Sequence, residues 1–162
     1  MESPLDYDVT KPFADMTAVQ NVMVGRMYGG DPIRSMKHGE RECEEILVFV
    51  GLGGKGASPA SAFSTVERKR LEIARALATK PKMLLLDEMM SGLTHTEMDE
   101  ALKLVKSIND SGITLIVVEH VMKAILDLST KVVVLSYGKK IAEGAPQEVM
   151  KDPTVIEAYL GE

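Results

Sequence analysis

The second half of the sequence alternates continuous apolar runs with segments of helical periodicity, and this alternation restricts the folds open to the chain. The apolar runs are MLLLD (83 to 87), TLIVV (114 to 118) and VVVLS (132 to 136). The segments THTEMDEALKLVKSIND and HVMKAILDLS lie between them. Short apolar strands that alternate with helices are typical of a parallel sheet covered on both faces. We therefore predict an α/β fold for this half.

The end of the chain and its first half predict other elements. After VVVLS, Tyr137-Gly138 predicts a turn into KIAEG, which we expect to be an antiparallel edge strand, and Pro146 and Pro153 stand where terminal helices can begin. The first half predicts helices only. Their expected ranges are Thr17 to Gly29-Gly30, with Thr17 and Gln20 at capping-box spacing; about Gly39 to Val50; and Ser64, capped with Glu67, to Pro81.

Composition excludes several classes of protein. The chain has 162 residues, of which 45% are hydrophobic and 27% charged, as expected of one globular domain. Its net charge of −5, without a concentrated basic face, argues against a nucleic-acid partner. The single cysteine, Cys43, suits a reducing compartment, and no apolar run approaches the roughly 20 residues of a membrane span.

Two adjacent carboxylates, Asp87 and Glu88, end the run MLLLD, as in nucleotide hydrolases that hold magnesium and a general base. Such a site needs a glycine loop for the phosphates. The segment GLGGKG (51 to 56) matches G-x-G-x-x-G, but helical periodicity precedes it and Pro59 follows it closely. A P-loop would need Ser or Thr after Lys55, where Gly56 stands. We interpret the segment as a connecting turn, so the phosphate loop is absent from this sequence.

Four motifs in order, FSTVERKRLEIARAL, MLLLDE, SGL and VVEH, resemble the signature helix, Walker B strand, D-loop and switch histidine of ABC-type ATPases. The tail from KVVVL onward and the early KPFADMTAVQNVMVG resemble, more narrowly, the ATP-binding subunits of branched-chain amino-acid importers. The resemblance covers about Lys11 to Glu162. It implies an incomplete P-loop NTPase (RecA-like) core with parallel strands, in residues 81–162, and an ABC-type helical subdomain with the signature helix, in residues 1–80.

The resemblance also implies roles for individual residues. Asp87 would contact Mg²⁺, Glu88 would polarise the attacking water, and His120 would contact the γ-phosphate of ATP. The signature would grip ATP held by a partner subunit, and the D-loop would follow the Walker B strand. These two motifs comprise Ser64, Thr65, Val66 and Glu67 (signature) and Ser91, Gly92 and Leu93 (D-loop). The implied cofactors are ATP and Mg²⁺.

Each motif also has a plain structural interpretation. The acidic pair can be the solvated end of a strand, His120 a helix-start residue, and Ser64 with Glu67 a simple capping box, although a capping box and a signature can coincide. The register of all four motifs favours the functional interpretation. The remaining histidines, His38 and His95, have no matching role and form no convincing metal cluster.

The sequence departs from the family pattern at several positions. Thr65 and Val66 replace the usual signature glycines, which predicts a weakened rather than a lost contact with phosphate. Met89 replaces a frequent proline, and Thr94-His95 follows the D-loop in place of Asn-Pro or Asp. Asp8 aligns with the Q-loop glutamine, and the Walker A strand and loop that would precede it are missing. This pattern predicts a truncated subunit.

Three functions remain open at this stage. The first is the signature-to-C-terminus portion of an ABC importer ATPase, inactive alone, on the inner face of the cell membrane, with a second ATPase subunit and transmembrane permease subunits as partners. The second is a non-catalytic interaction module that docks on a transporter or a partner ATPase. The third, an ABC relative acting on nucleic acid or chromosomes, is disfavoured by the acidic charge and the importer-like tail.

Overall fold

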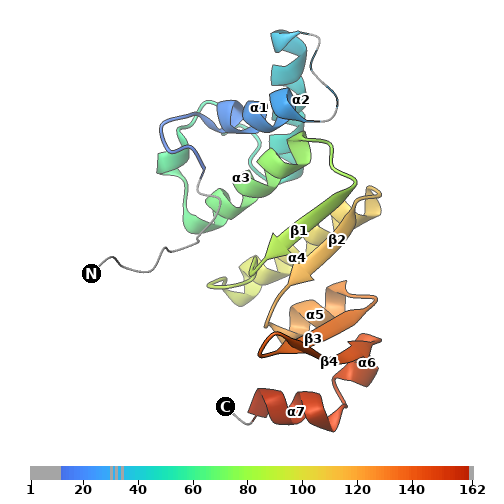
Figure 1. Cartoon of the computed structure of the whole chain (residues 1–162). Helices are drawn as coiled ribbons and strands as arrows, with labels where there is room; N and C mark the ends of the chain where they lie inside the picture. The colour runs from blue at the N-terminus through green and yellow to red at the C-terminus, as the bar shows by residue number, and fades with distance from the viewer. Residues whose placement is uncertain (1–11, 30, 32, 34, 161–162) are drawn as a thin grey trace, which may run out of the picture. The chain divides into compact units, whose positions relative to one another are not determined.

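The computed structural model describes residues 12–29, 31, 33 and 35–160 and divides into two compact units (Figure 1). The first unit comprises Met1–Leu84 and Gly112–Leu115, and the second comprises Leu85–Ser111 and Ile116–Glu162. The predicted domain boundary at residue 80 stays a prediction, and the Q-loop position at residue 8 lies outside the described residues. In the described part of the chain, no helix is long and apolar enough to cross a membrane.

The first unit is built from three packed helices, α1 (Ala18–Tyr28), α2 (Met36–Phe49) and α3 (Thr65–Ala78), with a short 3₁₀ turn at Ala60–Ala62 (Figure 1). All three helices were predicted. The second begins three residues before the predicted Gly39, because the side chain of Ser35 accepts the His38 N–H and caps the helix there. The helices bury one apolar set, which includes Val22, Met23, Leu47, Leu71, Ile73 and Ala74.

Two features hold α1 against its neighbours. Gly25 lets α1 approach α3 closely, since a Cβ at this position would lie 2.1 Å from the carbonyl oxygen of Arg75. Arg26, only 3% exposed, donates from Nε to Glu42 of α2 at 2.7 Å and from its terminal nitrogen to the carbonyl oxygen of Asp31. The Arg26 hydrogen bond holds the pKa of Glu42 below its usual value. This buried ion pair therefore fastens α1 to α2.

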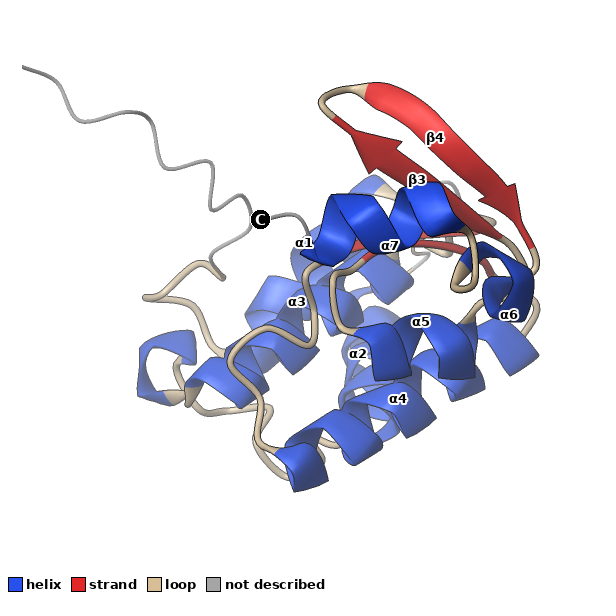
Figure 2. Cartoon of the chain, turned by 90° about the horizontal axis from the view of Figure 1, so that it is seen from below, coloured by secondary structure: helices blue, strands red, loops and turns tan. Residues whose placement is uncertain are grey.

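The second unit contains the helices α4 (His95–Asp110), α5 (Met122–Leu128), α6 (Pro146–Val149) and α7 (Pro153–Leu160) and the strands β3 (Val132–Ser136) and β4 (Lys139–Gly144). The antiparallel pairing of β3 with β4 confirms the predicted edge hairpin. Tyr137 and Gly138 form its turn with φ of 47° and 75°, as a two-residue hairpin loop requires. Helices α6 and α7 pack on this hairpin (Figure 2) around Val132, Val149 and Val155.

Strands β1 (Met83–Asp87) and β2 (Thr114–Val118) form a parallel pair, as predicted. Their common direction follows from two hydrogen bonds: the Thr114 N–H donates to the Lys82 carbonyl at 3.0 Å, and the Glu88 N–H donates to the Val118 carbonyl at 2.9 Å. Among the described residues, the strands form two separate pairs, β1–β2 and β3–β4.

The prediction that helices cover both faces of the parallel sheet is wrong for these strands. Leu84 and Leu86 are buried, but Leu85 between them is 69% exposed. On β2, Ile116 and Val118 are 47% and 58% exposed. Because side chains alternate along a strand, one face of the pair is covered, fully on β1 and partly on β2, and the other is largely exposed to solvent. Both faces of these strands carry apolar residues, although the described residues leave one of the two faces largely exposed.

Candidate active-site edge

The acidic pair lies where β1 ends and the backbone turns sharply. Asp87 is the last residue of the strand, and Glu88 has φ of 44°, a left-handed conformation that is uncommon for a residue other than glycine. The Ser91 N–H donates to the Glu88 carbonyl at 3.2 Å and closes a tight turn. The alternation that would send the two carboxylates to opposite faces therefore stops at Asp87, and both side chains are exposed.

His120 lies at the same edge of the sheet as the acidic pair. It follows β2 almost directly, and the carboxyl ends of adjacent parallel strands meet at one edge. The bond from Glu88 N–H to Val118 fixes the two strand ends to each other. The imidazole is exposed, and the carbonyl of His120 accepts from the hydroxyl of Tyr159 on α7 at 3.4 Å. The strand ends that carry Asp87, Glu88 and His120 thus lie side by side within the second unit.

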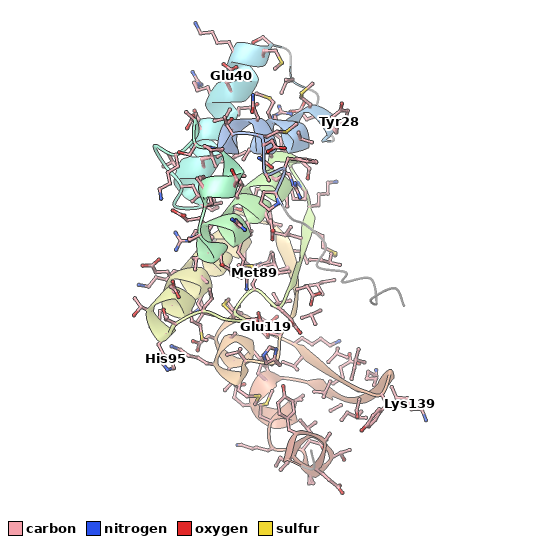
Figure 3. The ribbon with its side chains drawn as sticks, turned by 90° about the vertical axis from the view of Figure 1, so that its left-hand side faces the viewer. Tyr28, Glu40, Met89, His95, Glu119 and Lys139 are labelled. Carbon is pink, nitrogen blue, oxygen red and sulfur yellow. The ribbon has the colours of Figure 1, made fainter. Side chains whose placement is uncertain are left out.

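Glu119 is a further residue of this edge that the sequence analysis missed. One of its carboxylate oxygens, Oε1, accepts the Met90 N–H at 2.8 Å, and Figure 3 shows Glu119 close to the turn that carries Met89. Its other oxygen, Oε2, is buried and has no hydrogen-bond partner among the described residues. The only signal in the sequence is its position directly before His120 in VVEH.

The predicted D-loop continues the turn and leads into α4. Gly92 has φ of 74°, which favours glycine, and the Leu93 N–H donates to the Met90 carbonyl at 3.3 Å. Thr94 then caps α4: its hydroxyl accepts the Glu97 N–H, and the Glu97 carboxylate accepts the Thr94 N–H at 2.8 Å. The departure from the family pattern at residue 94 therefore has a local structural role, as the start of a helix.

The signature residues lie in the first unit, at the start of α3. The Ser64 hydroxyl accepts the Glu67 N–H at 3.3 Å, and the Glu67 carboxylate accepts the Ser64 N–H at 2.8 Å, which confirms the capping box. Thr65 is exposed and Val66 is half-buried. The N-terminal turn of α3 thus presents a hydroxyl and the positive end of a helix dipole, the features that favour an anion. Whether they act on a nucleotide stays a prediction.

The loop GLGGKG contacts the signature helix. It follows α2 and not a strand, and Gly51 and Gly54 have positive φ, so its interpretation as a connecting turn is confirmed. The Lys55 ammonium pairs with the Glu67 carboxylate. This pairing, together with the hydrogen bond from Ser64, lowers the pKa of Glu67 to about 2. Lys55 therefore supports the helix start.

We predict that acid weakens the start of α3. Because the pKa of Glu67 is about 2 in the folded chain and 4.5 in the unfolded one, its contribution to stability is complete above 4.5 and is lost as the pH falls toward 2. Lowering the pH from 6 to 2.5 should therefore reduce the melting temperature of both proteins. The reduction should be about 2 to 5 °C smaller in Glu67→Gln than in the parent. Thermal melts followed by circular dichroism measure this difference. Glu40→Gln, at an exposed position of α2, should leave the parent's dependence unchanged.

The exposed Asp87 fits the chemistry of a magnesium ligand. No group of three or more His, Cys, Asp or Glu side chains that could hold a metal occurs among the residues described. A Mg²⁺ ion that arrives with a nucleotide needs only one or two carboxylates, because phosphates and water fill its other positions. One carboxylate at the end of a strand satisfies that requirement.

Comparison with known proteins finds matches to ABC transporter family models and to ATP-binding proteins of transport systems. Residues 7–91 match the family model described as ABC transporter, and residues 139–162 match that of the branched-chain amino acid ATP-binding cassette transporter. The high-affinity branched-chain amino acid transport ATP-binding protein BraF of Pseudomonas aeruginosa is 32% identical over 163 residues, covering 93% of this chain and 64% of BraF. The nopaline permease ATP-binding protein P of Agrobacterium fabrum is 37% identical over 143 residues, covering 86% of this chain and 53% of that protein.

Solved structures give the same result for the fold. An ATP-binding cassette of an ABC transporter in its ADP conformation is 28% identical, with a TM-score of 0.80, over 92% of this chain and 64% of that one. A nucleotide-free cassette is 26% identical, also with a TM-score of 0.80, over 96% and 67%. The predicted fold class is confirmed. The chain spans about 64% of the length of the branched-chain amino acid transport proteins that it matches.

Proposed function

Because the chain belongs to the ABC transporter ATP-binding family, we propose that it supplies the portion from the signature helix to the C-terminal helix of a subunit for branched-chain amino-acid uptake. In the complete subunit, ATP binding and hydrolysis are coupled to transport. The observation that carries this proposal is the left-handed turn after β1, which presents Asp87 and Glu88 at the edge where His120 follows β2.

Each of the three residues at this sheet edge has a separate role in phosphoryl transfer. Asp87 holds Mg²⁺, which neutralises charge on the phosphates when it is bound. Glu88 orients and polarises the water that attacks the γ-phosphate, and its exposed carboxylate is accessible to that water. The imidazole of His120, one strand away, contacts the γ-phosphate. The chemistry is positioning plus electrostatic stabilisation, which fixed side chains at one sheet edge can provide.

The first unit contributes to a partner's site. The signature, Ser64 to Glu67, binds the ATP of a second ABC ATPase subunit through the Ser64 hydroxyl and the N-terminal end of α3. The side chains of Thr65 and Val66 weaken this grip, since they keep phosphate away from the backbone. Transmembrane permease subunits are the other partners, and the assembly lies on the cytoplasmic face of the membrane. This arrangement requires no nucleic acid.

A non-catalytic interaction module is the second candidate, and exposed apolar side chains of the second unit favour it. They are Leu85, Ile116, Val118, Val133 and Leu135. Single exposed apolar residues are ordinary, but here each of the two strand pairs, β1–β2 and β3–β4, carries more than one, which favours covering by another polypeptide. These strands serve the first candidate equally if the covering polypeptide completes the sheet.

We expect that a polypeptide with a β-strand followed by G-x-x-x-x-G-K-[ST], called the Walker A polypeptide below, makes the chain active. Co-expression should give a soluble complex that hydrolyses ATP, because the added loop supplies the phosphate contacts that the sequence lacks and the added strand pairs with an open edge. The 162-residue chain alone should bind Mg-ATP only weakly in titration calorimetry.

A Walker A polypeptide whose loop lysine is replaced by alanine is the matched control, and its complex should not hydrolyse ATP. Micromolar ATP binding by the chain alone would contradict the proposal. So would a monodisperse, cooperatively melting chain that the added polypeptide neither binds nor activates, and that result would favour the interaction module.

A further inference from the structure

We propose that Glu119 is a positioning residue that holds the turn carrying Glu88 to the end of β2, next to His120. The inference rests on the proposed function for its catalytic consequence and on the structure for its geometry. It concerns a side chain to which the resemblance assigns no role, although it stands directly before His120 in VVEH.

The first observation is that both anchors of the Glu88 turn come from consecutive residues of β2 and its end. The Glu88 N–H donates to the carbonyl of Val118 at 2.9 Å, and two residues later the Met90 N–H donates to Oε1 of Glu119 at 2.8 Å. The first anchor is an ordinary backbone bond of the sheet. The second needs this one side chain, because the backbone of β2 ends before it can pair with residue 90.

The second observation is that the turn needs an external anchor. Glu88 has φ of 44°, and a non-glycine residue in this region is held there only when its surroundings impose the conformation. A hydrogen bond to a carboxylate is stronger than one to a neutral acceptor, so Glu119 is a suitable restraint. The side chain of Met90 is itself buried, at 2% exposed, which also restrains this residue.

The third observation is the orphaned oxygen. Oε2 of Glu119 is buried without a hydrogen-bond partner among the described residues, which is unfavourable for a carboxylate. The unpaired oxygen lowers the stability of the fold, and a residue with such a cost is typical of a functional site.

The consequence is a mechanical link within the second unit. His120 is the next residue after Glu119, so a shift of the backbone at His120 moves Glu119 and, through Met90, the turn that carries Glu88. Glu119 itself does not touch the nucleotide in this scheme. It keeps Glu88, which polarises the water, in a fixed position relative to His120, which contacts the γ-phosphate.

Hydrogen exchange in the full chain tests the anchor. The Met90 amide should exchange about tenfold faster in Glu119→Ala than in the parent, because it loses its acceptor. Glu119→Gln keeps an acceptor oxygen and should stay close to the parent. Glu119→Asp keeps the charge but shortens its reach, so it should behave as the alanine variant does and remains informative if that variant does not fold. Glu157→Ala, on the exposed face of α7, is the control.

Steady-state hydrolysis by the complex with the Walker A polypeptide tests the catalytic consequence. In Glu119→Ala, kcat should fall about 10- to 100-fold while the KM for ATP changes little, since a misplaced turn affects the attacking water and not nucleotide binding. Glu119→Gln should restore kcat to within about threefold of the parent, because the acceptor geometry returns.

Equal exchange at Met90 in the parent and in Glu119→Ala would overturn the anchor, and an unchanged kcat in an active complex would overturn the positioning role. If the parent complex does not hydrolyse ATP at all, the proposed function fails and the role of Glu119 in the reaction fails with it. The exchange measurement still decides whether Glu119 holds the turn, so the two failures are distinguishable.

Discussion

Glu88→Gln should lower ATP hydrolysis by the complex of the chain with the Walker A polypeptide about 10²- to 10⁴-fold. Glutamine keeps the shape of the side chain but loses the charge and basicity that polarise the attacking water. The backbone anchors of the turn, from Glu88 N–H to Val118 and from Met90 N–H to Glu119, do not involve the substituted carboxylate. Phosphate release under saturating Mg-ATP measures the rate.

Binding must be measured beside the rate. ATP should bind to the Glu88→Gln complex at least as tightly as to the parent, and Glu157→Gln, on the exposed part of α7, should hydrolyse ATP at the parent rate. A Glu88→Gln complex that retains more than half of the activity would show that another group activates the water. Activity at that level would remove the main support for assigning catalysis to this sheet edge.

Arg26→Met should destabilise the first unit by about 3 kcal/mol. The methionine fills much of the same volume, but it leaves Glu42 and the carbonyl of Asp31 without the guanidinium that binds both. The Glu42 carboxylate is 20% exposed and keeps the exposed Lys80 ammonium at 3.3 Å, but that ammonium and water cannot fully replace the buried guanidinium. Urea unfolding followed by far-ultraviolet circular dichroism measures the free energy of unfolding.

Arg41→Met is the matched control for this substitution. Arg41 pairs with Glu45 one helical turn later at 3.3 Å, but both side chains are largely exposed, at 75% and 65%. Pairs of this kind contribute about 0.5 kcal/mol or less. Similar losses in the two variants would mean that the burial of Arg26 adds nothing, and the account of how α1 is fastened to α2 would be wrong.

Local signals in the sequence predicted most of the secondary structure. Capping boxes at Thr17 and Ser64 fixed two helix starts because both partners lie within one turn of the chain. The apolar runs predicted β1, β2 and β3 for the same reason, since a strand's pattern is complete within five residues, and the turn at Tyr137-Gly138 predicted β4. The order of four motifs then predicted the family, which the comparisons show.

Interactions between distant residues could not be predicted in this way. Glu119 binds an N–H that lies 29 residues earlier, and the Lys55–Glu67 pair joins a loop to a helix, so neither has a periodic or local pattern. Strand burial failed for a related reason. The run TLIVV shows that both faces of β2 are apolar, but only the three-dimensional structure shows that Ile116 and Val118 stay about half exposed beside the residues described.

The exposed faces of the strands also affect how chaperones and proteases would recognise this polypeptide in a cell. Chaperones and proteases recognise extended apolar segments, and Leu85, Ile116 and Val133 present such segments in the folded state, without any unfolding step. Folding alone therefore does not hide the chain from quality control. We therefore expect the amount of the chain in a cell to depend on the supply of a polypeptide that covers these strands, and an excess of the chain to be degraded or to aggregate.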